Sequence, residues 1–331
     1  MIDPSSHTSA PLFIIAACTT RKKQSQISVR LRNVTGASLT TRLKQWKTSL
    51  RQSQQNRLPA EHLYVGEYWS LIRQLPELCA SKFDTKLYVC SAGYGFISAD
   101  TKIANYSATF ASNHDDSVTT RADPKYASNT RRAWWKGMTG TRFTKLVERS
   151  PDAHVLVIAS PDYLDAMAND LNDIRLTLTN SEQLVIVSSR LPTVLKDVMR
   201  TNLVASVAKL ELSKDFLGGT RSSLHARTAR HLLTSVTPKT FLASKLRIKY
   251  QNKVNRITEP LPKFDREQHD REDIKEFIRD ELKKEHKGES KKQHSHTSLL
   301  RVLRDVKWWA CEQHRFARYF EEVKNEASLF R

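Results

Sequence analysis

The sequence alternates short, continuously apolar runs with longer segments of helical character, and this alternation limits the possible fold more than any other feature. The apolar runs cover residues 11–18, 86–91, 154–160 and 183–189. Runs of this length are typical of strands that are buried on both faces of a parallel sheet. Strands that alternate with helices indicate an α/β layer. The expected fold class is therefore α/β, with a mostly parallel sheet flanked by helices.

The segments between these runs predict the remaining elements of the layer. Helices are expected over 59–80, 131–148 and 161–178, and further strands within 201–212. A Gly-Gly turn followed by a basic amphipathic helix is expected over 214–236. Residues 19–57 are polar and basic with little periodicity, which predicts a long, mobile, positively charged insertion with a short helix around 39–50.

A change of composition near residue 260 predicts a domain boundary. From Lys263 to His296 the chain is almost wholly charged or histidine, so little of it can be buried and an exposed helix and linker are expected. The apolar helical pattern then returns in the stretch after it. We expect an α/β domain over 1–260, and a charged linker with a C-terminal basic helical module over 261–331.

The net charge of +19 is the strongest compositional signal. Residues 1–60 carry ten Lys and Arg against one acid, Asp3. Such a surface attracts polyanions, so nucleic acid is expected as substrate or partner; a general solubility charge is the alternative. Basic residues near the first strand, and Trp residues set among cations, are the candidate nucleic-acid contacts: Arg21, Lys23, Arg30, Arg131, Arg132, Trp134 and Trp135. Each Trp pair could equally be half core.

Cysteine spacing and hydropathy indicate a cytoplasmic protein. The four cysteines are widely separated and form no CxxC pair, which fits a reducing compartment and argues against a zinc ribbon. No apolar run is long enough to cross a bilayer, and the run over 10–18 lacks the basic lead-in of a secretory signal. Neither a membrane partner, a metal nor a cofactor is expected.

Two strand ends carry residues that suit a ligand site. In open parallel sheets, ligands bind outside the carboxyl ends of the strands. Cys18 ends the first run and Lys22 follows it, so nearby cations would stabilise a thiolate nucleophile. Free cysteine is nevertheless most often a small buried residue.

The second run ends in the stretch "VCSAGYGFISAD", where Ser91, Tyr94 and two glycines follow a buried strand. Gly93 and Gly95 would allow the backbone to approach a ligand closely. Ser91 and freed amides could donate hydrogen bonds, and Tyr94 could stack on a base. The alternative is an ordinary glycine turn in which Tyr94 caps the core.

The polar loop after this stretch offers further candidates. Tyr106, His114, Asp115 and Asp116 could supply general acid, base or orienting groups, although a His-Asp-Asp group in a loop is most often solvated surface. Metal binding by this group, or by His294 and His296, lacks the spacing of a known site.

Four motifs in order resemble a known family. The stretches "IIAACTTRKK", "LPAEHLYVGEYW" and "CSAGYGFISADTKIANYSATF" are similar to the YaaA-like superfamily, whose members show a Cys-Ser…Lys start, an "A…LY" helix, a "SA-x-YG" strand end and a "PYD-x-T" loop. Archaeosine synthases carry a similar Cys…Lys-Pro-Tyr core. Here Lys23-Gln24 replaces Pro-Tyr, and Asn105-Tyr106-Ser107 replaces Pro-Tyr-Asp.

The resemblance implies an enzyme of 7-deazaguanine DNA modification that hydrates the nitrile of 7-cyano-7-deazaguanine to an amide. It implies DNA as partner, with other proteins of a DNA-modification cluster. Matching positions for catalysis are Cys18, Lys22, Ser91 and Tyr94, and those for substrate binding are Gly93, Gly95, Tyr106 and Thr109. Cys90 is a competing nucleophile. The alternatives are a non-catalytic DNA-binding protein of a defence or stress system, and a glycosylase or transglycosylase using Asp115 or Asp116.

Overall fold

The computed structural model describes residues 9–23, 29–53, 56–112, 114–119, 126–214, 216–261, 265–286 and 294–328. The chain divides into two compact units, Met1–Pro260 and Leu261–Arg331. The boundary expected near residue 260 lies where these units meet.

A six-stranded, mostly parallel sheet forms the centre of the first unit, which confirms the expected α/β class. Its strand order is β10-β9-β8-β1-β4-β5. Neighbouring strands run parallel except for β4 and β5, which are antiparallel. The strands are β1 (Ala10–Ala17), β4 (Phe83–Ser91), β5 (Gly95–Ser98), β8 (His154–Ile158), β9 (Leu184–Ser188) and β10 (Leu203–Ala205).

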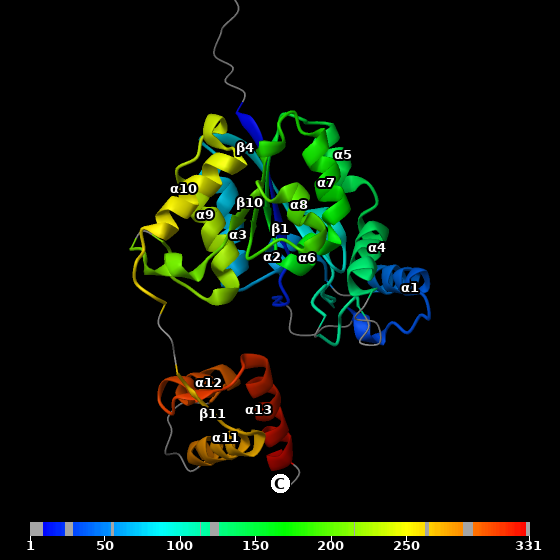
Figure 1. Ribbon diagram of the computed structural model, residues 1–331. Coiled ribbons are helices and arrows are strands. Elements are labelled where there is room, and N and C mark those ends of the chain that lie inside the picture. Colours follow the sequence, from blue (N-terminus) through cyan, green and yellow to red (C-terminus); the bar gives the residue numbers. More distant parts are fainter. Residues whose placement is uncertain are drawn as a thin grey trace, which may run out of the picture. The chain divides into compact units, whose positions relative to one another are not determined.

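Helices cover both faces of this sheet (Figure 1). One face is covered by α3 (Glu67–Cys79), α9 (Leu224–Thr234) and α10 (Ala243–Asn255). The other face is covered by α4 (Ala127–Thr139), α5 (Arg142–Glu148), α6 (Pro161–Ala166) and α7 (Ala168–Thr177). Burial on both faces explains why β1, β8 and β9 are continuously apolar.

The remaining elements of the first unit are short, apart from α1. They are β2 (Val29–Arg30), α1 (Leu39–Gln52), β3 (Leu58–Pro59), α2 (Ala60–Leu63), β6 (Lys102–Ile103), β7 (Tyr106–Ser107) and α8 (Lys196–Met199), with 3-10 turns at Leu31–Asn33, Ser181–Gln183, Thr193–Leu195, Ala208–Leu212, Arg221–Ser223 and Pro238–Thr240.

Each of the three long helices expected from the sequence is divided in two. The break between α2 and α3 includes Gly66, at φ +100°, and the break between α4 and α5 includes Gly140, at φ +63°. Glycine adopts these left-handed conformations without the steric cost that a Cβ imposes. The third helix divides at Met167, between α6 and α7.

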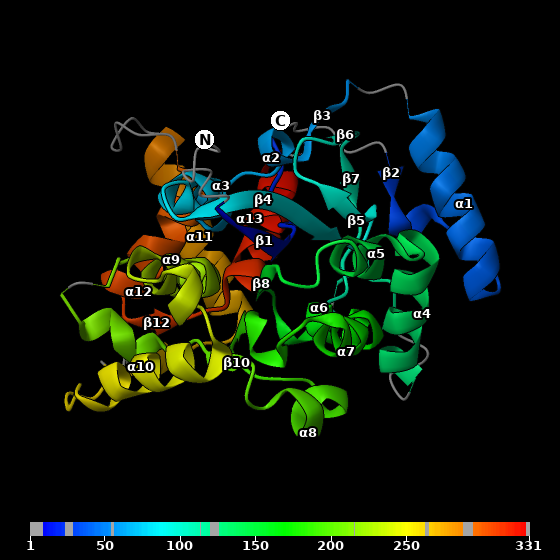
Figure 2. The ribbon, with the colours of Figure 1, turned by 90° about the horizontal axis from the view of Figure 1, so that it is seen from above.

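The described part of the basic insertion is packed against the domain, which corrects the expectation that this segment is mobile. Ser38 caps α1 by accepting the Thr41 N–H. Trp46 of α1 is fully buried, its ring lies 6.4 Å from that of Trp134 in α4, and its Nε1–H donates to Gly93 O at 2.8 Å. Figure 2 shows α1 alongside α4. Residues 24–28 and 54–55 of the insertion lie outside the described residues.

The second unit is a small helical module with its own apolar core. It contains β11 (Glu267–Gln268), α11 (Arg271–His286), α12 (His296–Asp305), β12 (Trp309–Ala310) and α13 (Gln313–Ser328). Its core includes Ile278, Leu299, Leu303 and Phe316. The charged segment expected to be exposed thus contributes an amphipathic helix, α11, to this core. Across the described part of the chain, no helix has the length and apolar character needed to cross a membrane.

The burial of the central strand β1 predicts where a substitution lowers the stability of the first unit most. Ile14 of β1 is fully buried, whereas Val198 of α8 is 43% exposed. Ile14→Ala should lower the free energy of unfolding by about 2–5 kcal/mol, because it removes packed atoms and leaves a cavity. Val198→Ala should change it by less than about 0.5 kcal/mol. Urea denaturation measures both, and similar losses for the two variants would contradict this assignment of the core.

Candidate active site

The carboxyl ends of β1, β4 and β8 lie side by side and bring distant residues together. After β1 the chain forms its parallel neighbour β4 on one side and later β8 on the other. In doubly wound sheets, such a reversal of strand order opens a crevice that binds ligands. Cys18 follows β1, Ser91 ends β4, and Tyr163 lies in α6 directly after β8.

The Cys18 thiol lies among phenolic hydroxyls at this edge of the sheet. Its Sγ is 3.2 Å from Tyr163 Oη, and the Tyr106 hydroxyl donates to it at 3.5 Å. The Cys18 backbone N–H donates to Cys90 O at 2.9 Å, which continues the β1–β4 pairing by one residue. Cys18 is half-buried, whereas Cys79, Cys90 and Cys311 are buried. It is therefore the most accessible of the four thiols.

Tyr106 connects the thiol to other buried hydroxyls. Its Oη lies 2.5 Å from Ser91 Oγ and 2.8 Å from Tyr64 Oη. Ser91 Oγ already accepts the N–H groups of Gly93 and Tyr94 at 3.1 and 3.0 Å, so its own proton is free to go to Tyr106. A hydroxyl has one proton to donate and can accept more than one hydrogen bond. Tyr106 can thus accept from Ser91 and Tyr64 while donating to Cys18.

These phenols remain protonated at neutral pH. Burial raises the pKa of Tyr64, Tyr106 and Tyr163 well above the usual value, because a buried phenolate loses its hydration. The nearby Cys18 also disfavours a negative charge on each of them. The thiol is therefore surrounded by O–H groups that can donate hydrogen bonds or protons.

Lys22 supplies the positive charge of the site. Its ammonium lies 4.3 Å from the centre of the Tyr106 ring and 5.7 Å from that of Tyr64, and it donates to Thr19 O and Thr20 O, both at 3.4 Å. A backbone bridge between Lys22 and Tyr64 fixes this segment. Burial lowers the Lys22 pKa, and attraction to Cys18 and Asp116 opposes that shift.

The two glycines of the stretch "VCSAGYGFISAD", Gly93 and Gly95, serve close packing. A Cβ on Gly93 would lie 2.3 Å from the Tyr106 ring, and a Cβ on Gly95 would lie 2.8 Å from the Met138 backbone. The Gly93 N–H, expected to face a ligand, instead donates to Ser91 Oγ. Gly93 therefore lets the Tyr106 ring approach the end of β4, and Gly95 lets the backbone of α4 approach the start of β5.

Tyr94 and Thr109 lie at the edges of this arrangement. The Tyr94 ring packs edge-on against Tyr106, with centres 5.2 Å apart, and its hydroxyl accepts the Ala104 N–H at 3.0 Å. Thr109 is buried, and its backbone N–H donates to Asp116 O at 2.9 Å. Tyr94 therefore supports Tyr106, which lies between it and the thiol.

The two tryptophans expected to contact nucleic acid belong to the core, which corrects that expectation. Trp134 is fully buried and Trp135 is 2% exposed. Their Nε1–H groups donate to Ala92 O and to the Asp170 carboxylate, each at 2.7 Å. Buried rings with satisfied N–H groups cannot stack on a base. The alternation of cations and aromatics on α4 reflects a helix that buries its aromatic face.

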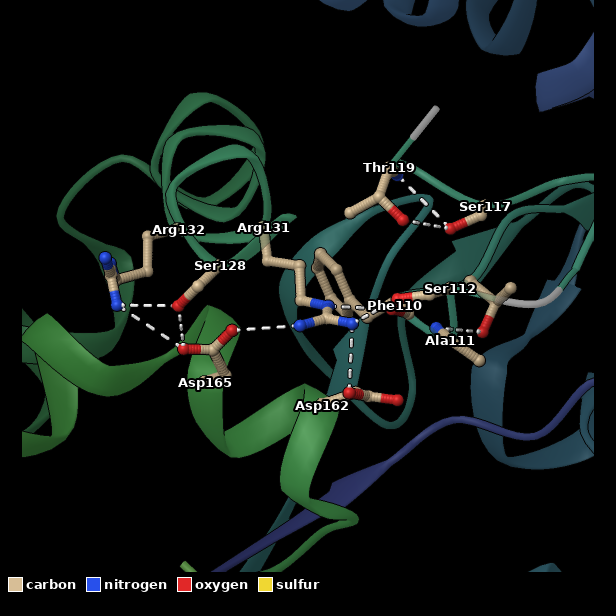
Figure 3. Close-up of polar contacts among 11 residues, drawn as sticks. Phe110, Ala111, Ser112, Ser117, Thr119, Ser128, Arg131, Arg132, Asp162 and Asp165 are labelled. Atoms are coloured by element: carbon tan, nitrogen blue, oxygen red, sulfur yellow. Dashed lines mark hydrogen bonds and ion pairs between the residues drawn. The ribbon is translucent and has the colours of Figure 1, made fainter. Parts of the chain in front are cut away.

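The arginines beside them form ion pairs within the protein (Figure 3), which also differs from the expectation. Arg131 is buried, donates to Phe110 O at 2.9 Å, and pairs with Asp162 and Asp165, both at 3.1 Å. Arg132 pairs with Asp165 at 3.4 Å. These contacts join α4 to α6, the helix that carries Tyr163. Arg131 and Arg132 therefore help to position the site, and their guanidinium groups bind carboxylates of the protein rather than a nucleic acid.

The other basic candidates divide into exposed and paired residues. Arg21 and Lys23 are exposed, and Arg30 lies 3.9 Å from Asp116. Arg32 binds the Asp116 carboxylate with two side-chain donors at 2.9 and 2.7 Å, and the Ser107 hydroxyl donates to it at 2.6 Å. Burial raises the Asp116 pKa, but these hydrogen bonds outweigh that effect and lower it to about 2.

Two tyrosines of the site, Tyr64 and Tyr163, were not among the candidates from sequence. Tyr163 follows the carboxyl end of the third apolar run, so the reasoning that selected Cys18 and Ser91 could have selected it too. Tyr64 lies within a helical apolar pattern, and only tertiary contact with Tyr106 distinguishes it from a core residue.

Comparison with family models, curated proteins and solved structures gave no match for this chain. Within the described ranges, no three His, Cys, Asp or Glu side chains gather in a way that could hold a metal ion.

Differences in burial predict which thiol alkylates first. Native protein treated with iodoacetamide at neutral pH should be modified at Cys18, because burial protects the other three thiols and raises the pKa of Cys79 to about 11. Peptide mass mapping identifies the modified residue, and Cys18→Ala should take up no label over the same period. Early labelling of Cys90 would contradict this description of the burial of the four thiols.

The Asp116 ion pair predicts a pH-dependent contribution to stability. Because its folded pKa of about 2 lies below the unfolded value of about 3.9, the pair stabilises the fold fully above that unfolded value, and the effect is lost as the pH falls through the folded pKa. At neutral pH, Asp116→Asn should lower the unfolding free energy by at most about 2 kcal/mol, since Arg32 is partly exposed. Denaturation of both proteins at neutral pH and near pH 2 should show the difference shrinking in acid.

Proposed function

We propose that this chain is a thiol-dependent enzyme that hydrates the nitrile of 7-cyano-7-deazaguanine, in DNA or as a nucleoside, to the amide. The observation that supports it is the half-buried Cys18 thiol at the reversal of strand order, with the Tyr163 and Tyr106 hydroxyls within 3.5 Å of the sulfur. The choice of a nitrile and of a deazaguanine rests on the resemblance to the YaaA-like superfamily.

The reaction balances with water as the second substrate. The Cys18 sulfur adds to the nitrile carbon and forms a C–S bond, and the nitrogen takes up a proton to give a thioimidate. Water then adds to the same carbon, the C–S bond breaks, and the sulfur leaves with its electron pair. Protonation of the sulfur restores the thiol as the amide is released. One nitrile and one water give one amide, so neither an oxidant nor a reductant is consumed.

The surrounding groups suit the charges that this sequence creates. Negative charge develops on the nitrile nitrogen during the first step, and on the sulfur during the second. Tyr163 has a protonated hydroxyl 3.2 Å from the sulfur and can return a proton to it or donate to the nitrogen. The Lys22 ammonium stabilises either negative charge. Tyr106, Ser91 and Tyr64 act as positioning residues through their connected hydroxyls.

The geometry favours Cys18 over the competing groups. Cys90 is fully buried, and burial raises its pKa well above the usual value, so it is a poor nucleophile at neutral pH. Asp116, the carboxylate considered for a glycosylase, is already bound by Arg32 and Ser107. A carboxylate with these partners is not available to attack or protonate a sugar.

Substitutions of Cys18 and Tyr163 test this chemistry. Purified protein would be incubated with an oligonucleotide that contains 7-cyano-7-deazaguanine, and the digested nucleosides would be analysed by mass spectrometry. Cys18→Ala should abolish amide formation. Tyr163→Phe keeps the ring and removes the proton donor, so turnover should fall by about 10²-fold or more. Cys311→Ala, in the second unit, should leave turnover unchanged.

Two outcomes would contradict the proposal. Amide formation by Cys18→Ala at the wild-type rate would eliminate covalent catalysis at this residue. The absence of any amide with the wild-type protein, on both oligonucleotide and nucleoside, would favour the alternative of a non-catalytic DNA-binding protein. Thermal unfolding of each variant distinguishes a loss of chemistry from a loss of fold.

A further inference from the structure

The second unit has a strained backbone conformation at a large, exposed side chain. Among the residues that the structure describes, Trp308 is the one non-glycine residue with a positive φ, at +59°. In this left-handed region the Cβ lies too close to a neighbouring carbonyl oxygen, so bulky residues rarely adopt it. The side chain is nevertheless a tryptophan, and it is 52% exposed. Residues held in such conformations are concentrated at functional and ligand-binding sites.

Backbone pairing between β11 and β12 holds Trp308 in place. The residue directly precedes β12, and its carbonyl oxygen accepts the Glu267 N–H at 2.9 Å. The next residue, Trp309, packs against the apolar core of the unit, and its ring stacks on that of His269 with centres 3.7 Å apart. One tryptophan of the pair therefore supports the core, whereas about half of the Trp308 side chain faces solvent.

The charge around Trp308 is mainly positive. Residues 296–319 contain five Lys and Arg against two Asp and Glu. Lys307, which directly precedes Trp308, is exposed. Three arginines and one acid line a cavity of about 360 Å³ that adjoins β12: Arg266, Arg304, Arg315 and Glu312. An exposed ring beside several cations suits a ligand that combines a flat apolar group with negative charge.

Contacts within the unit hold two of these guanidinium groups in position. Arg266 donates to Arg304 O at 2.9 Å and pairs with Asp305 at 3.2 Å. Arg304 in turn donates to Cys311 O at 3.2 Å. Arg315, at the start of α13, is exposed. The arginines of the cavity therefore include two in a fixed orientation and one at the surface.

We propose that the second unit binds single-stranded nucleic acid, with the Trp308 ring stacked on an unpaired base and the nearby cations beside the adjoining phosphates. Proteins that bind single strands without sequence preference combine aromatic rings with a basic surface in this way. Every base has a flat π face, so one exposed ring can stack on any of them. The site lies in the second unit and does not depend on the chemistry at Cys18.

Removal of the ring tests the proposal. Full-length protein would be titrated into a short fluorescein-labelled oligothymidylate, and binding would be followed by fluorescence anisotropy. Trp308→Gly should weaken binding by about tenfold or more, which is the affinity that one stacked base contributes. Trp308→Phe keeps an aromatic ring and should retain most of the affinity. Wild-type affinity in Trp308→Gly would overturn the proposal.

A strand without bases separates stacking from charge. An abasic oligonucleotide of the same length keeps the phosphates but cannot stack, so wild type and Trp308→Gly should bind it equally. If the variant loses the same factor on both strands, Trp308 acts through the fold or the charge of the unit, and the proposal of stacking is wrong.

The matched control removes apolar surface from the same turn. Val306 lies two residues before Trp308 and is 69% exposed. Val306→Ala should bind the oligothymidylate like wild type, since an aliphatic side chain offers no face for a base. An equal loss in Val306→Ala and Trp308→Gly would indicate a general apolar contact surface, as in protein–protein interfaces, and would overturn the proposal.

The backbone conformation also allows a check on folding. Glycine adopts a φ of +59° without steric cost, whereas alanine keeps the strain, so Trp308→Gly should unfold at no lower a temperature than Trp308→Ala. Neither variant has a ring, and both should lose the same affinity for the oligothymidylate. A loss of binding that followed the unfolding temperature instead would contradict stacking. Cys18→Ala should bind like wild type, which separates this result from any failure of the nitrile chemistry.

Discussion

The arrangement of the residues around Cys18 depends on the buried hydroxyl of Tyr106. It lies within hydrogen-bonding distance of Ser91 and Tyr64 and donates to the Cys18 sulfur. A buried hydroxyl without partners costs free energy, so the three segments that carry these residues are held in one relative position. Gly93 is part of the same constraint, because a Cβ there would overlap the Tyr106 ring. The end of β4 and the segment that carries Tyr106 can therefore pack against each other only in this arrangement.

The insertion after β1 takes part in that constraint. Trp46 of α1 donates to Gly93 O, and its ring packs edge-on against Tyr106 with centres 6.2 Å apart. On the other side, the Arg131 ion pairs fasten α4 to α6, which carries Tyr163. Contacts from α1, α4 and α6 thus hold the residues around Cys18 in place. Much of the basic and aromatic character near the site serves this assembly.

The sequence predicts the sheet, its parallel direction and the position of Cys18 and Ser91 at strand ends, because burial on both faces demands continuous apolar runs. The divided helices were less predictable, since Gly66 and Gly140 are tolerated in a helix as well as at a break. The functions of α4 residues could not be predicted either. A Trp among cations has the same local pattern whether its ring faces the core or the solvent, and only packing decides between them.

Local sequence patterns alone predict the α/β layer, the concentration of charge and a thiol with a nearby lysine at the end of the first strand. Tertiary structure alone decided which hydroxyls surround that thiol, since Tyr64, Tyr106 and Tyr163 are far apart in the chain and meet only when β1 lies between β4 and β8. It also decided that the arginines of α4 pair with Asp162 and Asp165 of α6. In both cases, hydrogen bonds and ion pairs depend on distances of a few ångströms, which local sequence patterns do not specify.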